Sequence, residues 1–139
     1  MGLFNRDIVR GNSDIDPQFL PIIDAAREVH AELGPGFDLS IYSKALGVEM
    51  LSGSIRATDH PRYPLFYKDQ PLEEIWEPAW EVDGEIAVEV VVEDPLLPAT
   101  GQRMAHSLKM AGRLKGLLLN FGSPTLEYRR FVSVETAPE

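Results

Sequence analysis

A single charged residue, Glu89, interrupts the most strand-like stretch of the sequence. Residues 86–92 read Ile-Ala-Val-Glu-Val-Val-Val, and so apolar a run is typical of a central strand covered on both faces. A buried carboxylate is costly unless it is paired or protonated. Carboxylates gathered at one place are also the ligands that hard divalent cations prefer. Glu89 is therefore the first candidate for chemistry in this chain.

An acidic stretch precedes Glu89 and offers further carboxylates. Strand alternation decides whether Glu77 or Glu81 shares a face with Glu89, and the position of the hairpin turn leaves this open. One interpretation is a metal site for Ca²⁺, Mg²⁺ or Mn²⁺ built from these acids. The other is a solvated hairpin edge that discourages pairing with other strands. The acidic residues are Glu73, Glu74, Glu77, Glu81, Asp83 and Glu85.

Other reactive groups give no comparable pattern. The sequence has no cysteine, which excludes disulfides, thiolate zinc sites, iron–sulfur clusters and cysteine nucleophiles. The histidines at 30, 60 and 106 lie in three different elements without the spacing of metal ligands. We expect His30 to pack or hydrogen-bond at a helix end and the other two to lie on the surface. There is also no phosphate loop, dinucleotide fingerprint or nucleophile elbow.

The charge balance bears on the choice of partner. The chain of 139 residues has 22 acidic and 13 basic side chains, a formal net charge of −9. Such a surface repels phosphate backbones and anionic membranes, so we expect a protein partner or self-association rather than a nucleic acid. No apolar run reaches the ~18 residues of a membrane span, and we expect a cytoplasmic protein. Positive charge is concentrated only at Arg103, Lys109, Arg113, Lys115, Arg129 and Arg130.

Helical signals appear in three places. The first helix is expected from Asp16-Pro17, an N-cap acid followed by proline, to Gly34-Pro35-Gly36. The proline at 21 is a weak point that favours a later start. A second helix is expected from about Asp38 to Ser52, and a third from Thr100 to Gly112. We divide the chain into an N-terminal arm (1–15), one domain (16–134) and a C-terminal tail (135–139).

Strand signals occupy the remaining segments. Strands are expected at 54–59 and 63–68, in a hairpin over 74–92 that turns at Asp83-Gly84, at 117–119 and at 128–134. Trp76 and Trp80 are expected on one side of that hairpin, either in the core or as an aromatic patch. The order of elements predicts a single α/β (α+β) domain with one mixed sheet.

Two segments carry a resemblance to a known family. The residues Glu28-Val29-His30-Ala31-Glu32-Leu33-Gly34-Pro35-Gly36, followed six residues later by Tyr42, resemble the start of GxxExxY proteins. The segment Leu117-Leu118-Leu119-Asn120-Phe121-Gly122 is similar to a later part of the same family. That family is a branch of the PD-(D/E)XK nuclease superfamily. The resemblance covers roughly 22–132 and implies a mixed sheet flanked by helices. The motif residues are Glu28, His30, Gly36, Tyr42 and Asn120.

The resemblance also implies where a nuclease site would lie. Such nucleases hold one or two divalent cations with clustered carboxylates and place a lysine near the attacking water. The glutamate in the family's name falls on Leu39, and the metal-binding aspartate falls on Ala79. The second glutamate is kept as Glu89, and the lysine falls on Val91. Since only Glu89 survives, the resemblance implies a degraded site that holds no metal.

The same alignment suggests a partner for the remaining carboxylate. Arg103 stands where the family has a glutamine on the helix beside the site. We therefore predict a Glu89–Arg103 ion pair of structural rather than catalytic use.

Three functions follow as hypotheses. The first is a nuclease-fold protein of GxxExxY type that has lost metal-dependent cleavage, needs no cofactor and acts as a binding module. The second is a working Mg²⁺- or Mn²⁺-dependent nuclease whose ligands have moved to Glu77 or Glu81 beside Glu89. The third is a small-molecule binder that uses the vacated space between Leu39, Ala79 and Val91.

Overall fold

The structure is a computed structural model, and it describes residues 2–4 and 17–135. Most of the arm predicted at 1–15 and of the tail predicted at 135–139 lies outside these described residues. The helices are α1 (Leu20–Leu33), α2 (Leu39–Ser52) and α3 (Pro98–Ala111). The strands are β1 (Gly2–Phe4), β2 (Ala57–Asp59), β3 (Tyr63–Tyr67), β4 (Gln70–Trp76), β5 (Trp80–Val82), β6 (Ile86–Val91), β7 (Lys115–Asn120) and β8 (Glu127–Glu135).

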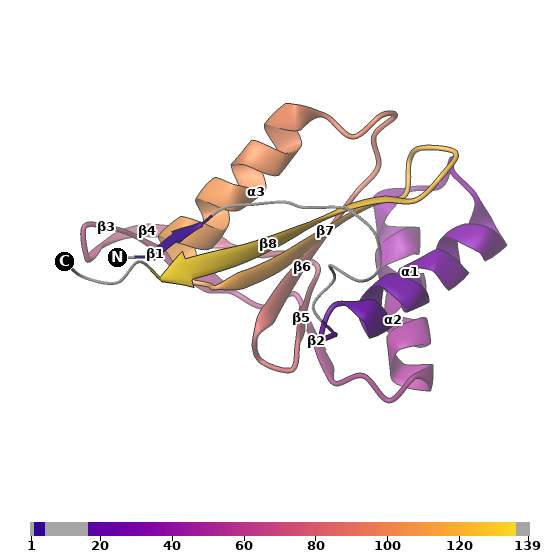
Figure 1. The fold of residues 1–139 in the computed structure, drawn as a ribbon, viewed down its shortest axis with the longest axis horizontal. Coiled ribbons are helices and arrows are strands. Elements are labelled where there is room, and N and C mark those ends of the chain that lie inside the picture. Colours follow the sequence, from indigo (N-terminus) through magenta and orange to yellow (C-terminus); the bar gives the residue numbers. More distant parts are fainter. Residues whose placement is uncertain (1, 5–16, 136–139) are drawn as a thin grey trace.

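A mixed sheet forms the centre of the molecule (Figure 1). Its strand order is β1-β8-β7-β6-β5-β2. Strands β6 and β7 are parallel, and the other neighbouring pairs of this sheet are antiparallel. The parallel pair needs a crossover, which α3 provides between them. The predicted α/β (α+β) fold with one mixed sheet flanked by helices is therefore confirmed.

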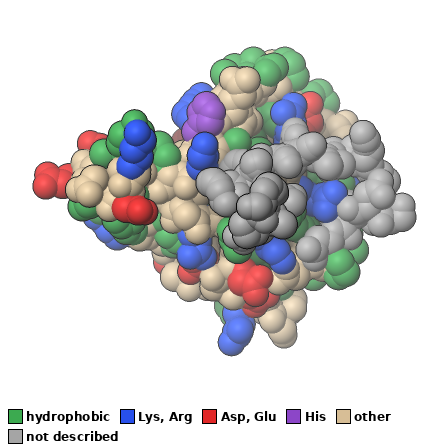
Figure 2. All heavy atoms as spheres, turned by 60° about the vertical axis from the view of Figure 1, so that its left-hand side comes forward, with side chains coloured by type: hydrophobic (Ala, Val, Ile, Leu, Met, Phe, Trp, Pro, Cys, Tyr) green, Lys and Arg blue, Asp and Glu red, His purple; other side chains and the backbone are tan. Residues whose placement is uncertain are grey.

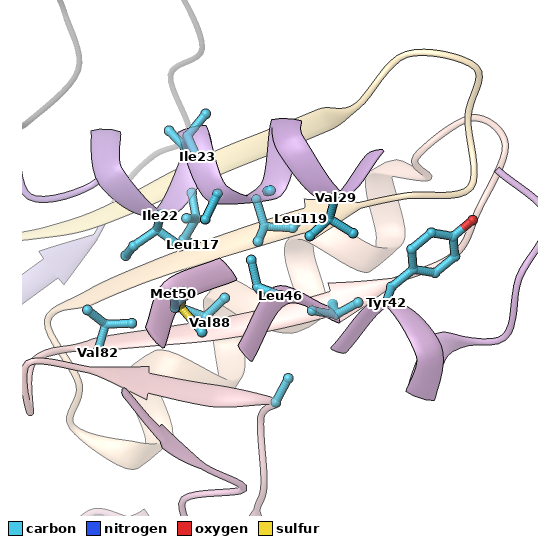
Figure 3. Close-up of a cluster of buried hydrophobic side chains, with 14 of the residues drawn as sticks. Ile22, Ile23, Val29, Tyr42, Leu46, Met50, Val82, Val88, Leu117 and Leu119 are labelled. Atoms are coloured by element: carbon cyan, nitrogen blue, oxygen red, sulfur yellow. The ribbon is translucent and has the colours of Figure 1, made fainter. Parts of the chain in front are cut away.

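Each face of the sheet is covered by its own helices. Alternate residues of β6 point to opposite faces. Ile86, Val88 and Val90 join the cluster formed by α1 and α2, whereas Ala87 lies among the residues that pack under α3. Figure 3 shows the first cluster, in which Ile22 and Val29 of α1 lie near Leu117 and Leu119 of β7. The middle strands are thus buried on both sides, as the apolar composition of 86–92 predicted.

The hairpin expected over 74–92 is only half correct. The turn at Asp83-Gly84 does join β5 to β6. The segment before it, however, forms β4, which pairs with β3 in a separate two-stranded sheet. Pro78, which is buried and has no N–H to donate, separates β4 from β5. We refer to the β3–β4 pair as the outer hairpin.

The first helix begins later than its predicted N-cap. It starts at Leu20 rather than at Pro17, and the N-cap residue Phe19 makes no side-chain cap. Pro21 occupies the first turn, where its missing N–H costs nothing. No helix in the part of the chain that is described is long and apolar enough to cross a membrane.

The two tryptophans do not share a face. Trp80 packs against the cluster under α1 and α2, whereas Trp76 packs against the cluster under α3. The expectation of one aromatic side was wrong because the two residues lie in different sheets. Both side chains are half-buried, so they belong to the core rather than to an aromatic patch.

Gly47 of α2 lies against Trp80, which gives a test of this packing. A Cβ at Gly47 would lie 2.5 Å from Cζ2 of the Trp80 ring. We expect Gly47→Ala to lower the free energy of unfolding by about 1–3 kcal/mol, although alanine favours helix. Gly101 of α3 is the control, because its added Cβ meets only the end of the Arg129 side chain, at 3.1 Å. Gly101→Ala should leave stability unchanged or raise it in urea unfolding, and equal effects at both positions would contradict the packing.

Candidate functional site

Glu89 lies on the α3 face of β6 under the outer hairpin. The indole Nε1–H of Trp76, the last residue of β4, donates to Oε2 of Glu89 at 3.3 Å. The backbone amides of Val90 and Ala79 also hydrogen-bond to this carboxylate. A strand from a separate sheet therefore supplies the side-chain donor for the one charged residue of β6.

Burial dominates the electrostatics of Glu89. Loss of hydration raises the pKa of its carboxyl above the usual value, and the hydrogen bonds from Trp76, Val90 and Ala79 offset this only in part. A raised pKa means that the neutral form is favoured by folding. Without a nearby cation, the site therefore favours the neutral carboxyl.

A second carboxylate, Glu81, lies on the same face. It is directly opposite Ala87 in the β5–β6 register, and Ala87 is two residues from Glu89. Its Oε2 accepts hydrogen bonds from the Tyr63 hydroxyl at 2.7 Å and from the Arg113 guanidinium at 2.8 Å. Both side chains of this Arg113–Glu81 ion pair are mostly buried. The Glu81 carboxylate is therefore already engaged by two donors.

Tyr63 connects the two carboxylates. Its ring packs against Trp76 at a centroid distance of 5.6 Å, and the Arg113 guanidinium lies 4.7 Å from the centre of the Tyr63 ring. Burial, followed by the hydrogen bond to Glu81, raises the pKa of the Tyr63 hydroxyl, which stays protonated as a donor. Tyr63, Trp76, Glu81, Glu89 and Arg113 thus form one cluster, which we call the capped carboxylate cluster.

Of the four positions of the expected nuclease site, Glu89 and Val91 share one face of the sheet. Ala79 immediately precedes β5, and its amide reaches the Glu89 carboxylate. Val91 is two residues beyond Glu89 on β6, so it faces the same side and packs against the cluster under α3. The fourth position, Leu39, begins α2 and is 47% exposed, and α2 covers the opposite face of the sheet. Glu89 and Val91 thus lie together, Ala79 reaches Glu89 only through its backbone amide while its side chain packs under α1 and α2, and Leu39 lies apart.

Known proteins were compared with the chain at three levels. A family model described as the PD-(D/E)XK nuclease superfamily matches residues 18–131, which is most of the chain. The chain belongs to this superfamily. Neither the curated proteins nor the solved structures include a match.

The predicted ion pair between Glu89 and Arg103 is not formed. Arg103 is exposed on α3, and no ion pair joins it to Glu89 in the described part of the chain. The reason is that the outer hairpin covers Glu89, so Trp76 takes the position in which a cation was expected. Trp76 and Tyr63 were missed as site residues because they reach the cluster only through the pairing of β3 with β4. Arg113 was missed because it reaches Glu81 from the loop between α3 and β7.

These side chains do not fit the divalent cation of a PD-(D/E)XK nuclease. No group of three or more His, Asp or Glu side chains that could hold a metal occurs among residues 2–4 and 17–135. Glu77, the other acid considered as a replacement ligand, is exposed and pairs with Arg62. Mg²⁺ keeps several of its waters and is bound through one or two carboxylates that face it. Here Oε2 of Glu89 accepts from Trp76, and Oε2 of Glu81 accepts from Tyr63 and Arg113, so these oxygens face N–H and O–H donors instead of a cation.

Asn120 of the family motif holds the scaffold around the site. It is fully buried at the end of β7, and its Oδ1 accepts from the amides of Glu93 and Gly122 at 2.8 and 3.0 Å. Its Nδ2 donates to the Glu93 carbonyl and to Oε1 of Glu127, each at 2.8 Å. The turn after β6 is thereby fixed to β7. Nothing in the sequence spacing pointed to Glu93 or Glu127 as partners.

The other motif residues also serve the fold. Tyr42 donates its hydroxyl to the Gly34 carbonyl and accepts from the Phe37 amide, which closes the α1–α2 turn. Gly36 has a φ of 112°, a conformation that favours glycine. The Nε2 atom of His30 lies 2.9 Å from the Ser123 carbonyl, as a histidine at a helix end was expected to do. Glu28 is exposed on α1.

Glu89→Gln tests the cost of the buried charge. Glutamine keeps an oxygen that accepts from Trp76 and removes the charge, so the variant should be more stable than the parent at pH 8. Because the folded-state pKa of Glu89 is raised, the parent carries a penalty above this pKa that disappears as the pH falls through it. The difference in melting temperature should therefore shrink toward pH 4. Glu28→Gln, at an exposed position, is the control and should show no such trend.

Asn120→Ala tests the scaffold. The substitution leaves the amides of Glu93 and Gly122 without their acceptor, so we expect a loss of about 2–4 kcal/mol in the free energy of unfolding. Thr125→Ala, at an exposed position in the loop that follows β7, should cost less than about 0.5 kcal/mol. Urea unfolding of both variants measures the difference, and a small effect at Asn120 would contradict its structural role.

Proposed function

We propose that this protein is a PD-(D/E)XK-fold binding module that has lost metal-dependent nuclease activity and acts by contacting a protein chain. The observation that carries the proposal is the capped carboxylate cluster. The one acid retained from the superfamily's site, Glu89, is covered by Trp76 and has a raised pKa. Its two sheet neighbours, Ala79 and Val91, have no ligand atoms to offer.

A protein partner suits the charge distribution better than a nucleic acid does. The chain has a net charge of −9. Much of its local positive charge is used within the fold, because Arg113 pairs with Glu81 and Lys115 lies 3.7 Å from Glu85. Arg130 is buried beside the Phe19 ring. These three cations are therefore already engaged within the fold, which weakens the one local concentration of positive charge that could neutralise phosphates.

A working nuclease with moved ligands is the second candidate. One observation favours it, namely that Glu81 and Glu89 lie on the same face of β5 and β6. It requires the Arg113–Glu81 ion pair and the Trp76–Glu89 hydrogen bond to open, and a third ligand to reach the site from elsewhere.

The pocket expected for a small molecule, between Leu39, Ala79 and Val91, is not supported by the packing of these residues. Ala79 packs under α1 and α2, Val91 packs under α3, and Leu39 is exposed, so the three do not enclose a common space. Two cavities on the described surface are lined by other residues.

Cleavage of DNA and RNA with Mg²⁺ or Mn²⁺ tests the proposal, with Glu89→Ala run beside the parent. We expect the parent to show no cleavage above the background of the variant. Metal-dependent cleavage that the substitution abolishes would overturn the proposal in favour of moved ligands.

A titration with Mn²⁺ separates loss of metal binding from loss of chemistry. The chain has two tryptophans, and their indole N–H groups give two NMR signals. Trp76 donates to Glu89, whereas Trp80 donates to the Ser43 carbonyl at 3.0 Å and serves as the internal control. We expect both signals to broaden equally or not at all. Selective broadening of the Trp76 signal at low Mn²⁺ would place a cation at Glu89 and contradict the proposal.

A further inference from the structure

A groove separates the outer hairpin from the end of α3. It has a volume of about 990 Å³, at the upper end of the range of small-molecule pockets, and it is large enough for a peptide segment. Its walls are the turn of the outer hairpin and the last turn of α3 with the loop that follows. Figure 2 shows the side of the molecule that holds the outer hairpin, where hydrophobic side chains and those of Lys or Arg lie next to one another. The groove adjoins the capped carboxylate cluster at Arg113, which lines the groove and pairs with Glu81.

The lining combines apolar surface with an excess of positive charge, since Lys68, Lys109 and Arg113 outnumber its one acid, Asp69. Phe66, Tyr67 and Leu114 line the groove and are 42%, 58% and 64% exposed. Lys68 and Lys109 also line it, and no ion pair within the described ranges engages either ammonium group. Lys68 lies over the Tyr67 ring, at 5.5 Å from its centroid. On a chain with a net charge of −9, such a groove selects an acidic segment that also carries apolar side chains.

The chain itself presents a segment of this chemistry. Strand β4 reads Gln-Pro-Leu-Glu-Glu-Ile-Trp, and all of its residues except Trp76 are exposed. Leu72 and Ile75 are 40% and 47% exposed on either side of Glu73 and Glu74. The outer edge of β4 pairs with no other described strand. Two carboxylates flanked by two aliphatic side chains thus match the two ammonium groups and the apolar lining of the groove.

Direct pairing of β4 with β4 of another copy is the competing arrangement. It would place Glu73 and Glu74 against the same acids of the second chain, and like charges placed opposite each other destabilise a strand pair. Glu73 also has a φ of 61°, and the register of the outer hairpin shifts between Pro64 and Phe66. An irregular acidic edge of this kind opposes edge-to-edge pairing. The groove avoids both problems because it offers lysines.

We propose that this protein forms a twofold dimer in which residues 72–75 of each copy bind in the groove between the outer hairpin and α3 of the other. The proposal names the partner of the binding role put forward above and rests on it. The contact is self-complementary, because each chain carries both the segment and the groove beside the same hairpin. A contact of this type closes at two copies instead of growing into a filament.

Charge-exchange variants test the dimer by sedimentation velocity over a wide range of protein concentration. The wild type should convert from monomer to dimer as its concentration rises. Lys68→Glu/Lys109→Glu should stay monomeric, and so should Glu73→Lys/Glu74→Lys, because each places like charges in contact. An equimolar mixture of the two variants should recover the dimer. In the mixed dimer, the acidic segment of one variant meets the basic groove of the other, and the basic segment meets the acidic groove. All four positions are exposed, and circular dichroism checks that the variants fold.

Several results would overturn the proposal. A wild type that stays monomeric throughout, variants that still dimerise, or a mixture that fails to associate would each do so. Binding of a labelled single-stranded oligonucleotide that Lys68→Glu/Lys109→Glu abolishes would instead assign the groove to nucleic acid. None of these results depends on Glu89, so the Mn²⁺ and cleavage experiments remain a separate test of the lost nuclease site.

Discussion

Burial of one carboxylate in a strand covered on both faces governs the arrangement of this site. The polar groups around Glu89 must replace the water that its carboxylate loses, and the sheet supplies only the amides of Ala79 and Val90. The third donor comes from Trp76 at the end of the outer hairpin. That hairpin must therefore lie over β5 and β6, and its other strand then brings Tyr63 onto Glu81. A single charged residue thus accounts for much of the cover on this face.

The residues of the family motif maintain the frame of the site rather than its chemistry. Asn120 fixes the turn after β6 to the end of β7, and Glu127 extends this network to the amide of Leu96 before α3. Burial acts to raise the pKa of Glu127, but hydrogen bonds from Leu96, Asn120 and Ser123 together lower it. On the other face, Tyr42 closes the turn between α1 and α2. Such a frame does not depend on catalysis, so it can be kept in a protein that, as proposed above, has lost the nuclease activity.

Local sequence signals predicted the elements well and their pairing less well. Apolar periodicity and the glycine stop signals located the three helices, and the run at 86–92 identified the central strand, because these signals depend on near neighbours in the chain. The separate pairing of β3 with β4 depends on contacts across the fold, so the hairpin was assigned too long a first arm. The same limit explains the error over Arg103. The alignment placed a cation beside Glu89, but only the covering hairpin determines which donor reaches it.

The outer hairpin therefore has two different sides, and their chemistry explains how it can serve a binding role. Its inner aromatic residues, Tyr63 and Trp76, satisfy buried carboxylates, a requirement that exists only because Glu81 and Glu89 are present. The other residues of β4, 70–75, are exposed and include two acids, and these side chains serve neither the core nor the cluster. An element held in place by one face can change the other face at little cost to stability. The hairpin thus offers a fixed platform on which a recognition segment can evolve independently of catalysis.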